Sequence, residues 1–408
     1  MRLTLKKRMW IYSTLGILTT IVVLAFARLS YGVVLPFMRE GLQITYKEAG
    51  LLGTVTSLGY VSMVMFAGVL AAKWGGRQTI LLGISIVTVG FIGLTFTPFY
   101  SVTIVFMLLL GIGTAFTYTP LISLLVAWFP KHKGFVIGLT ASGVGAGMLL
   151  TGFIIPSLNS VYPELGWRMS WGLFAIISFF VVVFTFLLIK NPPNTSSLDQ
   201  NNEQSSPKLI YKNRNVINVG FIYGILGIAY IVQMLFIMSF MIEYGINIRL
   251  AGQLIALNGV LSIFSGPIWG MISDHLGRRQ SLIFTMALTF LFMLLPIFYP
   301  TLIGFTIHII GISCTLIGLF TLVQAASMDQ VKPADMPLAF SYVTLYFATG
   351  QFIGPTIAGW LIDDWGGFKS AFLFSSICLS IGLLLCFKVK AAPSSEAEAE
   401  PKLSAEMN

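Results

Sequence analysis

Twelve runs of apolar residues, each about as long as a membrane-spanning helix, dominate this sequence of 408 residues. A helix of about 20 residues crosses roughly 30 Å of hydrocarbon and satisfies its own backbone hydrogen bonds. The runs are continuous rather than alternating, which favours helices over a β-barrel. The predicted spans are residues 10–37, 49–71, 79–97, 102–128, 134–158, 167–189, 215–241, 251–272, 281–298, 301–326, 337–362 and 369–387.

The overall composition also indicates a membrane protein. Hydrophobic residues make up 56% of the chain and charged residues 10%, which leaves too little polar surface to cover a water-soluble core. The first apolar run is too long for a signal peptide and lacks a small-residue cleavage site, so we expect it to be the first span. All cysteines fall inside predicted spans, which argues against a disulfide framework or a zinc site: Cys314, Cys378 and Cys386.

Lysine and arginine are divided unequally between the two sets of loops. If the N-terminus is inside, the cytoplasmic segments hold eighteen: Arg2, Lys6, Lys7, Arg8, Lys73, Arg77, Lys131, Lys133, Lys190, Lys208, Lys212, Arg214, Arg278, Arg279, Lys332, Lys388, Lys390 and Lys402. The outer loops hold five: Arg39, Lys47, Arg168, Arg249 and Lys369. This bias predicts a multi-pass protein of the cell membrane with both termini in the cytoplasm. The net charge of +9 is scattered over inner loops, so no nucleic-acid partner is expected.

The chain is predicted to consist of two similar halves, residues 1–190 and 215–390. Residues 191–214 are rich in Asn, Gln, Ser and Pro and predict a flexible cytoplasmic linker, and residues 391–408 predict a disordered tail. Five positions match in order at an offset of 202–203: Gly68 with Gly270, Arg77 with Arg279, Pro98 with Pro300, Pro130 with Pro333, and Gly147 with Gly350. The matches indicate that the two halves arose by duplication.

A specific motif follows the eighth predicted span, from Gly270 to Arg279, with the sequence Gly-Met-Ile-Ser-Asp-His-Leu-Gly-Arg-Arg. It resembles the cytoplasmic-loop signature of major facilitator transporters. The resemblance implies an all-α membrane protein with twelve transmembrane helices in two six-helix pseudo-symmetric halves. A carboxylate at a helix end can pair with arginines in one conformation and release them in another, so we expect a latch here. Alternatively, the two arginines only enforce topology.

The first half carries a degraded version of this motif, in which Ala72 replaces the expected Asp and Gly76 replaces a basic residue. Two glycines of the intact motif are expected to serve close helix approach (Gly270) and a tight turn (Gly277). The candidate latch residues of both halves are Gly68, Lys73, Arg77, Gly270, Asp274, Gly277, Arg278 and Arg279.

Further stretches resemble the monocarboxylate and oxalate/formate branch of the superfamily and its uncharacterised bacterial relatives. They are residues 128–138, residues 166–168, and the segment from Arg28 to Pro36. The chain departs from other branches: Met107 stands where many proton-driven members have an arginine. The fifth span is glycine-rich, with Gly143, Gly145, Gly147 and Gly152 for close helix packing, but lacks the Gly-Pro-Gly-Gly pattern of drug antiporters. These features weaken a multidrug assignment.

Arg28 is a lone cation inside a predicted span. A charge at mid-membrane costs about 2.5–3.5 kcal/mol on insertion scales, and no Asp or Glu lies in the interior of any predicted span to neutralise it. We therefore expect the substrate to supply the anion, gripped by the guanidinium through paired hydrogen bonds. The alternatives are snorkelling to the headgroups or bonding to carbonyls of a broken helix.

Other polar side chains within the spans are candidates for the lining of a substrate cavity: Tyr31, Tyr60, Tyr118, Tyr223, Tyr230, Gln233, Asn258, Gln324, Tyr342 and Tyr346. Each of them could instead bond to a neighbouring helix. His308 is the only histidine within a span and the only candidate for a proton relay, although a lone histidine on an apolar helix is more often a packing residue.

These features predict a secondary transporter that moves a small organic anion, such as a carboxylate, by alternating access. The alternative is an efflux pump for hydrophobic or amphipathic compounds, favoured by the many Phe and Met residues. No catalytic residue, metal or cofactor is expected, since the chain has no HExxH motif and only three histidines. The expected partners are the small-molecule substrate and the bilayer, with possible proton coupling, and we expect a monomer.

Overall fold

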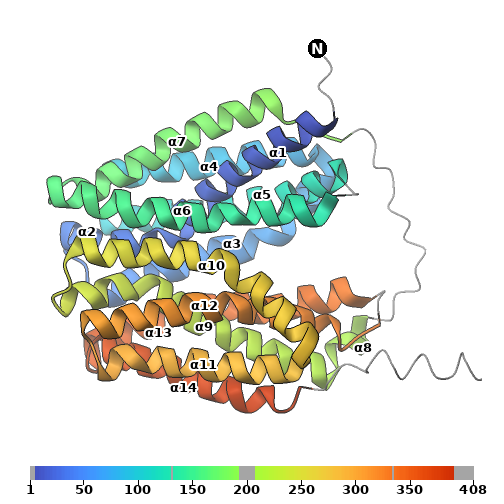
Figure 1. Ribbon diagram of the computed structural model, residues 1–408. Helices are drawn as coiled ribbons and strands as arrows, with labels where there is room; N and C mark the ends of the chain where they lie inside the picture. Colours follow the sequence, from blue (N-terminus) through green and yellow to red (C-terminus); the bar gives the residue numbers. More distant parts are fainter. Residues whose placement is uncertain (1–4, 130–131, 193–206, 333–334, 390–408) are drawn as a thin grey trace, which may run out of the picture.

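The computed structural model describes residues 5–129, 132–192, 207–332 and 335–389, and over these residues the protein is a bundle of long helices without a β-strand (Figure 1). Figure 1 shows α4–α7 in the upper part of the bundle and α11–α14 in the lower part. The first seven helical segments are α1 (Leu5–Thr20), η1 (Ile21–Leu29), α2 (Tyr31–Leu42), α3 (Tyr46–Trp74), α4 (Gly76–Phe96), α5 (Tyr100–Trp128) and α6 (Lys133–Val161). The others are α7 (Gly166–Leu188), α8 (Pro207–Tyr211), α9 (Arg214–Glu243), α10 (Ile248–Leu276), α11 (Arg278–Phe298), α12 (Leu302–Met328), α13 (Met336–Asp364) and α14 (Phe368–Cys386).

The twelve predicted spans correspond to twelve long helices when α1, η1 and α2 are counted together. Among the described residues, eleven helices are long and apolar enough to cross a membrane. The twelfth, α13, is not among these eleven. It has 29 residues, and only α9 is longer, but it carries more polar side chains. The predicted all-α membrane fold is confirmed.

The first span is not the continuous α-helix that the sequence predicts. Its middle, η1, is a nine-residue π-helix in which the wider turn lets the amide of Ser30 donate to the carbonyl of Ala25 over 2.7 Å. Such wider turns are frequent at functional sites, and Arg28 lies in this one. Hydrophobic periodicity does not reveal a π-helix here, because eight of the nine residues of η1 are apolar.

The predicted linker and tail fall largely on the parts of the chain that the structure does not describe. Residues 193–206 of the linker and the tail 391–408 lie outside the described residues. Within the rest of the linker, residues 207–211 form the short helix α8, and Asn213 caps α9 by accepting a hydrogen bond from the amide of Asn215 over 2.9 Å. The boundaries of the two predicted halves remain a prediction.

The two ends of the bundle differ in how closely helices of the two halves approach. We call the end where α1 begins and α14 ends the termini side, and the opposite end the far side. Towards the far side, a Cβ on Gly145 of α6 would lie 2.7 Å from the carbonyl oxygen of Gly259 of α10, so the two backbones are almost in contact. On the termini side of α3, α6 and α10, a Cβ on Gly68, Gly138 or Gly270 would meet no atom within 4 Å.

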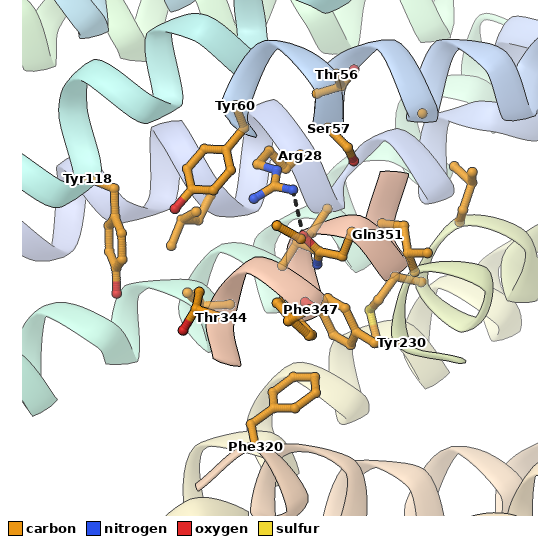
Figure 2. Close-up of a pocket in the computed structure, with 18 of the residues that line it drawn as sticks. Arg28, Thr56, Ser57, Tyr60, Tyr118, Tyr230, Phe320, Thr344, Phe347 and Gln351 are labelled. Carbon is orange, nitrogen blue, oxygen red and sulfur yellow. Dashed lines mark hydrogen bonds between the residues drawn. The ribbon is translucent and has the colours of Figure 1, made fainter. Parts of the chain in front are cut away.

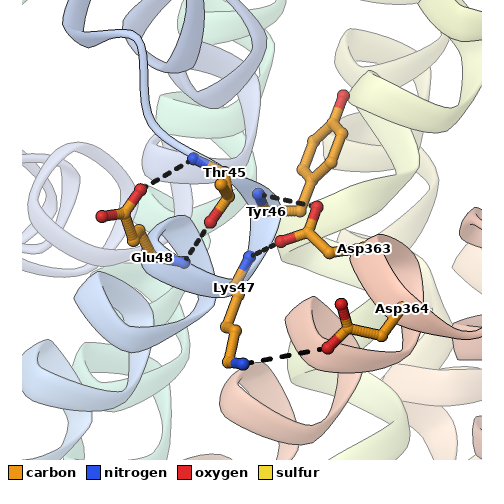
Figure 3. A network of polar contacts seen from close by, with 6 residues as sticks. All are labelled: Thr45, Tyr46, Lys47, Glu48, Asp363 and Asp364. Carbon is orange, nitrogen blue, oxygen red and sulfur yellow. Dashed lines mark hydrogen bonds and ion pairs between the residues drawn. The ribbon is translucent and has the colours of Figure 1, made fainter.

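Charged and hydroxyl groups join α3 to α13 at the far side (Figure 3). The carboxylate of Asp363 accepts hydrogen bonds from the amides of Tyr46 and Lys47, over 3.2 and 2.6 Å, at the start of α3. Thr45 and Glu48 form a capping box on the same turn, so three side chains accept from the amides of residues 45–48. Asp364 lies 3.8 Å from the ammonium of Lys47. The carboxylate of Asp363 thus caps a helix of the other predicted half.

Replacing Asp363 with Ala should loosen the first turn of α3. The amides of Tyr46 and Lys47 would lose their acceptor, and the loss of a capping oxygen typically costs about 1 kcal/mol. We expect hydrogen–deuterium exchange over residues 46–48 to become ~5-fold faster, measured by mass spectrometry on the protein in detergent.

Asp364→Ala is the matched control. Its carboxylate contacts only the exposed Lys47 side chain in this network, and exposed ion pairs contribute little. Equal exchange in the two variants would contradict a capping role for Asp363.

Candidate functional site

A cavity of about 370 Å³ lies between the two sets of helices (Figure 2). One wall comes from η1, α3 and α5, which supply Arg28, Thr56, Ser57, Tyr60 and Tyr118. The facing wall comes from α9, α12 and α13. The cavity is thus built from both predicted halves, and neither half completes it alone.

Arg28 projects into this cavity from the π-helix (Figure 2). Its Nη2 donates a hydrogen bond to Oε1 of Gln351 in α13 over 3.0 Å. Its guanidinium carbon lies 4.6 Å from the ring centroid of Tyr60, which gives a cation–π contact. No carboxylate of the described chain forms an ion pair with Arg28. The cation is therefore held by an amide and a ring, and its charge is not neutralised by the protein.

Four aromatic rings form the wall opposite Arg28. The rings of Tyr223 and Phe347 are stacked, with centroids 4.5 Å apart. Phe320 meets Tyr230 and Phe347 edge to face, at 5.1 and 5.2 Å. We call these four residues the aromatic wall: Tyr223, Tyr230, Phe320 and Phe347. Aromatic packing of this kind fixes the rings in place.

Seven of the side chains predicted to bind substrate line the cavity: Arg28, Tyr31, Tyr60, Tyr118, Tyr223, Tyr230 and Gln324. Besides Arg28, three of these also bond to a neighbouring helix. The hydroxyl of Tyr31 donates to the carbonyl of Ala49 over 2.9 Å, and Nε2 of Gln324 donates to the hydroxyl of Tyr223 over 2.8 Å. Tyr31 therefore both lines the cavity and bonds to a neighbouring helix, which was the alternative role given for each lining candidate.

The other four predicted residues are not among those lining the cavity: two pair with each other within α13, and two bond to α12. The hydroxyls of Tyr342 and Tyr346 lie 3.0 Å apart and pair with each other. Asn258 accepts a hydrogen bond from Ser313 of α12 over 2.7 Å. Gln233 lies with its Oε1 2.9 Å from Nε2 of His308. Polarity within a span therefore did not distinguish cavity walls from helix contacts.

His308 is fully buried away from the cavity lining. Its Nδ1 lies 2.7 Å from the carbonyl oxygen of Phe292, and its Nε2 faces Gln233. Both ring nitrogens are thus engaged in a helix contact, which is the packing role that a lone histidine commonly has.

Sequence reasoning missed several lining residues, chiefly on α13. Phe340, Thr344, Phe347, Ala348 and Gln351 all line the cavity. Their spacing of four, three, one and three is the periodicity of one helix face. Gln351 lies in mid-span and could have been singled out by its polarity, whereas the rings could not, because apolar residues are everywhere in the spans.

Two of the predicted latch residues, Asp274 and Arg278, form an ion-pair cluster with Asp329 on the termini side. Arg278 lies 3.2 Å from Asp274 and 3.4 Å from Asp329, and donates to the hydroxyl of Ser273 over 2.6 Å. Gly277 adopts φ +85°, which the predicted tight turn requires. Close helix approach at Gly270, in contrast, is absent from this conformation, since a Cβ there would meet nothing within 4 Å.

The corresponding positions of the first half show which part of the motif is shared. Arg77 and Arg279 both donate to a backbone carbonyl over 2.7 Å, of Phe186 and Phe387 respectively. The side chain of Lys73 is exposed. Because Ala72 replaces the carboxylate, the part of the first half that the structure describes has no counterpart of this ion-pair cluster.

Comparison with known proteins relates this chain to a family of membrane transporters. The sequence profile of the Major Facilitator Superfamily matches residues 17–322 and 219–406. The chain is 22% identical over 377 residues to the Hexuronate transporter of Bacillus subtilis, covering 85% of this chain and 87% of that one. It is 25% identical over 379 residues to Monocarboxylate transporter 12 of Mus musculus, covering 79% and 75%. A Multi-drug resistance efflux pump PmrA homolog of Lactococcus lactis is 22% identical over 389 residues, covering 89% and 91%.

Solved structures share the fold at low sequence identity. The crystal structure of a bacterial homologue of the human lysosomal transporter Spinster, in an inward-facing and unoccupied conformation, superimposes with a TM-score of 0.80. The identity is 14%, and the match covers 94% of this chain and 96% of that one.

The contact between Arg28 and Tyr60 can be tested through stability. Tyr60→Leu should lower the thermal unfolding midpoint in detergent, because a cation–π contact contributes about 0.5–2 kcal/mol, whereas Tyr60→Phe keeps the ring and should leave the midpoint unchanged. In an Arg28→Gln background the difference between the two variants should disappear. A difference that persists there would show that only ring packing is lost.

Proposed function

This chain belongs to the Major Facilitator Superfamily of membrane transporters, and on that premise we propose that it carries a small organic anion by alternating access. The observation that supports this most is the unneutralised charge of Arg28 in the cavity. Among the described residues that line the cavity, it bears the only charge, and the nearby Gln351 and Tyr60 leave that charge unneutralised. A substrate carboxylate would neutralise this charge through paired, charge-assisted hydrogen bonds.

The relatives are consistent with an acidic substrate. Hexuronates and monocarboxylates, the substrates in the names of two of them, are both carboxylates. Among the described residues, none that lines the cavity is Asp, Glu or His. If transport is coupled to protons, the proton would therefore travel with the weak acid itself rather than on a protein relay in the cavity.

Alternating access would proceed by rocking of residues 1–190 against residues 215–390. In the conformation described here, Asp363 and the glycine contacts between α6 and α10 hold the far side together, while glycines on the termini side face open space. We propose that the termini lie in the cytoplasm, so that this is the inward-facing state. Gly68 and Gly270 then become close-approach positions when the cytoplasmic side closes, and the cluster around Arg278 is rearranged.

Efflux of amphipathic compounds is the second candidate. The aromatic wall and the aliphatic residues that line the cavity favour it, as does the resemblance to the multidrug efflux pump homologue. The two candidates differ in charge preference. A pump for lipophilic cations would be impeded by an unneutralised guanidinium in its cavity, so the anion carrier explains Arg28 better.

Arg28→Gln should abolish exchange of labelled carboxylates in liposomes that contain the purified protein. The neutral amide keeps hydrogen-bonding capacity but loses the charge, and charge-assisted contacts are roughly twice as strong as neutral ones. We expect at least a ~100-fold loss of rate, with Arg28→Lys retaining part of the activity because its charge is unchanged but its two-pronged geometry is lost.

Arg249→Gln is the control for this test. Arg249 is a far-side arginine whose Nη2 donates to the hydroxyl of Ser160 over 3.3 Å, and its loss should leave exchange unchanged. Normal exchange by folded Arg28→Gln protein would refute the proposed anion site. Imposing a pH gradient on the same liposomes measures whether a proton accompanies the anion.

The proposed orientation predicts the behaviour of fusions after Val389. Green fluorescent protein placed there should fluoresce in bacterial cells, and alkaline phosphatase there should be inactive, because both report whether the junction is cytoplasmic. Fusions after Gly245, in a far-side loop, should give the reverse result. Active phosphatase after Val389 would overturn the orientation.

A further inference from the structure

We propose that the preferred substrate is an amphipathic carboxylate, with its anionic group at Arg28 and an aryl or branched apolar group against the aromatic wall. This rests on the proposed function, because it takes the anion site at Arg28 as given and adds the chemistry of the rest of the molecule. Such acids should be preferred over heavily hydroxylated acids such as hexuronates and over very small acids.

The two walls of the cavity offer different chemistry. The wall that holds Arg28 also bears the hydroxyl groups of Thr56, Ser57, Tyr60 and Tyr118 (Figure 2). The wall from α9, α12 and α13 bears the four rings. A ligand that spans the cavity therefore meets a cation and hydroxyls at one end and ring faces and edges at the other.

Several polar groups of the second wall are already occupied within the protein. Nε2 of Gln324 donates to the hydroxyl of Tyr223. The hydroxyl of Thr344 donates to the carbonyl of Phe340 over 2.8 Å, within its own helix. Oε1 of Gln351 accepts from Arg28. These bonds leave few polar atoms of this wall for the hydroxyls of a ligand, and a buried polar group left unpaired is costly.

The aromatic wall is held in a fixed shape before any ligand binds. Phe320 contacts both Tyr230 and Phe347, and Phe347 stacks on Tyr223, so each ring is restrained by at least one other. Rigid rings gain contact area with a ligand at little cost in side-chain entropy. A cavity of about 370 Å³ is also within the range of small-molecule sites, and it has room for more than a two- or three-carbon acid.

The test is competitive binding to the purified full-length protein with four probes: 3-phenylpropanoate, propanoate, glucuronate and 3-phenylpropanamide. We expect 3-phenylpropanoate to bind ~10- to 100-fold more tightly than propanoate, since burial of one aromatic ring gives a factor of this size. Glucuronate should bind no better than propanoate. The neutral amide should bind ~10-fold or more weakly than the acid, because it lacks the charge.

Variants locate the preference at the aromatic wall. Phe320→Leu keeps an apolar side chain but removes a ring, and should reduce the affinity for 3-phenylpropanoate ~5- to 10-fold while leaving that for propanoate unchanged. Phe298→Ala is the matched control: this ring of α11 is 68% exposed and lies outside the cavity, so neither affinity should change. Phe347→Leu provides a second test if Phe320→Leu does not fold.

The outcomes separate this inference from the proposed function. If propanoate or glucuronate binds as tightly as 3-phenylpropanoate, and Arg28→Gln abolishes that binding, the anion site stands and the amphipathic preference is wrong. If the phenyl preference is present but is not altered by Phe320→Leu or Phe347→Leu, the assignment to the aromatic wall is wrong. If the amide binds as tightly as the acid, the anion site itself is wrong and both proposals fall.

Discussion

An arginine without a carboxylate partner, placed between two sets of helices inside a membrane, is the constraint on which the rest of this structure depends. The energetic cost of burying this charge is reduced by two contacts, with the amide of Gln351 on one side and the ring of Tyr60 on the other. Because Gln351 belongs to α13 and Arg28 to η1, the cation is held jointly by both predicted halves. Any movement of one set of helices against the other must change its environment.

The two predicted halves repeat the same framework but use different chemistry on it. Gly75 and Gly277 both adopt positive φ, at +93° and +85°, at the same point of the repeat. At the far side, however, Asp363 binds the start of α3 with its carboxylate, whereas the pair at the start of α10 is the weaker bond between Arg249 and Ser160. The repeated framework thus sets the positions of these contacts, and the residue types at equivalent positions of the two halves decide which contacts are charged.

Much of the fold could be predicted because lipid imposes one strong rule, that backbone polar groups are satisfied within each helix. That rule leaves a direct trace in hydropathy, so the spans were found, and Arg28 was found because a charge inside a span is rare. The two tyrosines of the aromatic wall were predicted from their polarity, but its two phenylalanines left no such trace. Phe320 and Phe347 are chemically the same as Phe298, which lies outside the cavity, and only the packing of α12 against α13 and α9 distinguishes them. Tyr342 and Tyr346 are polar but are not among the residues that line the cavity, and their hydroxyls pair with each other.

The division of the cavity into a cationic wall and an aromatic wall bears on how a ligand would influence the conformational equilibrium. A ligand shifts an equilibrium only by its differential affinity for the two states. A carboxylate bound to Arg28 alone would itself contact mainly one set of helices, and would be linked to the other set only through the bond between Arg28 and Gln351. A ligand that also touches the rings of α9, α12 and α13 contacts both sets at once, and its contacts depend on their separation. Such a ligand favours the arrangement in which both walls approach it, so the same feature that selects an amphipathic acid would also couple its binding to the movement.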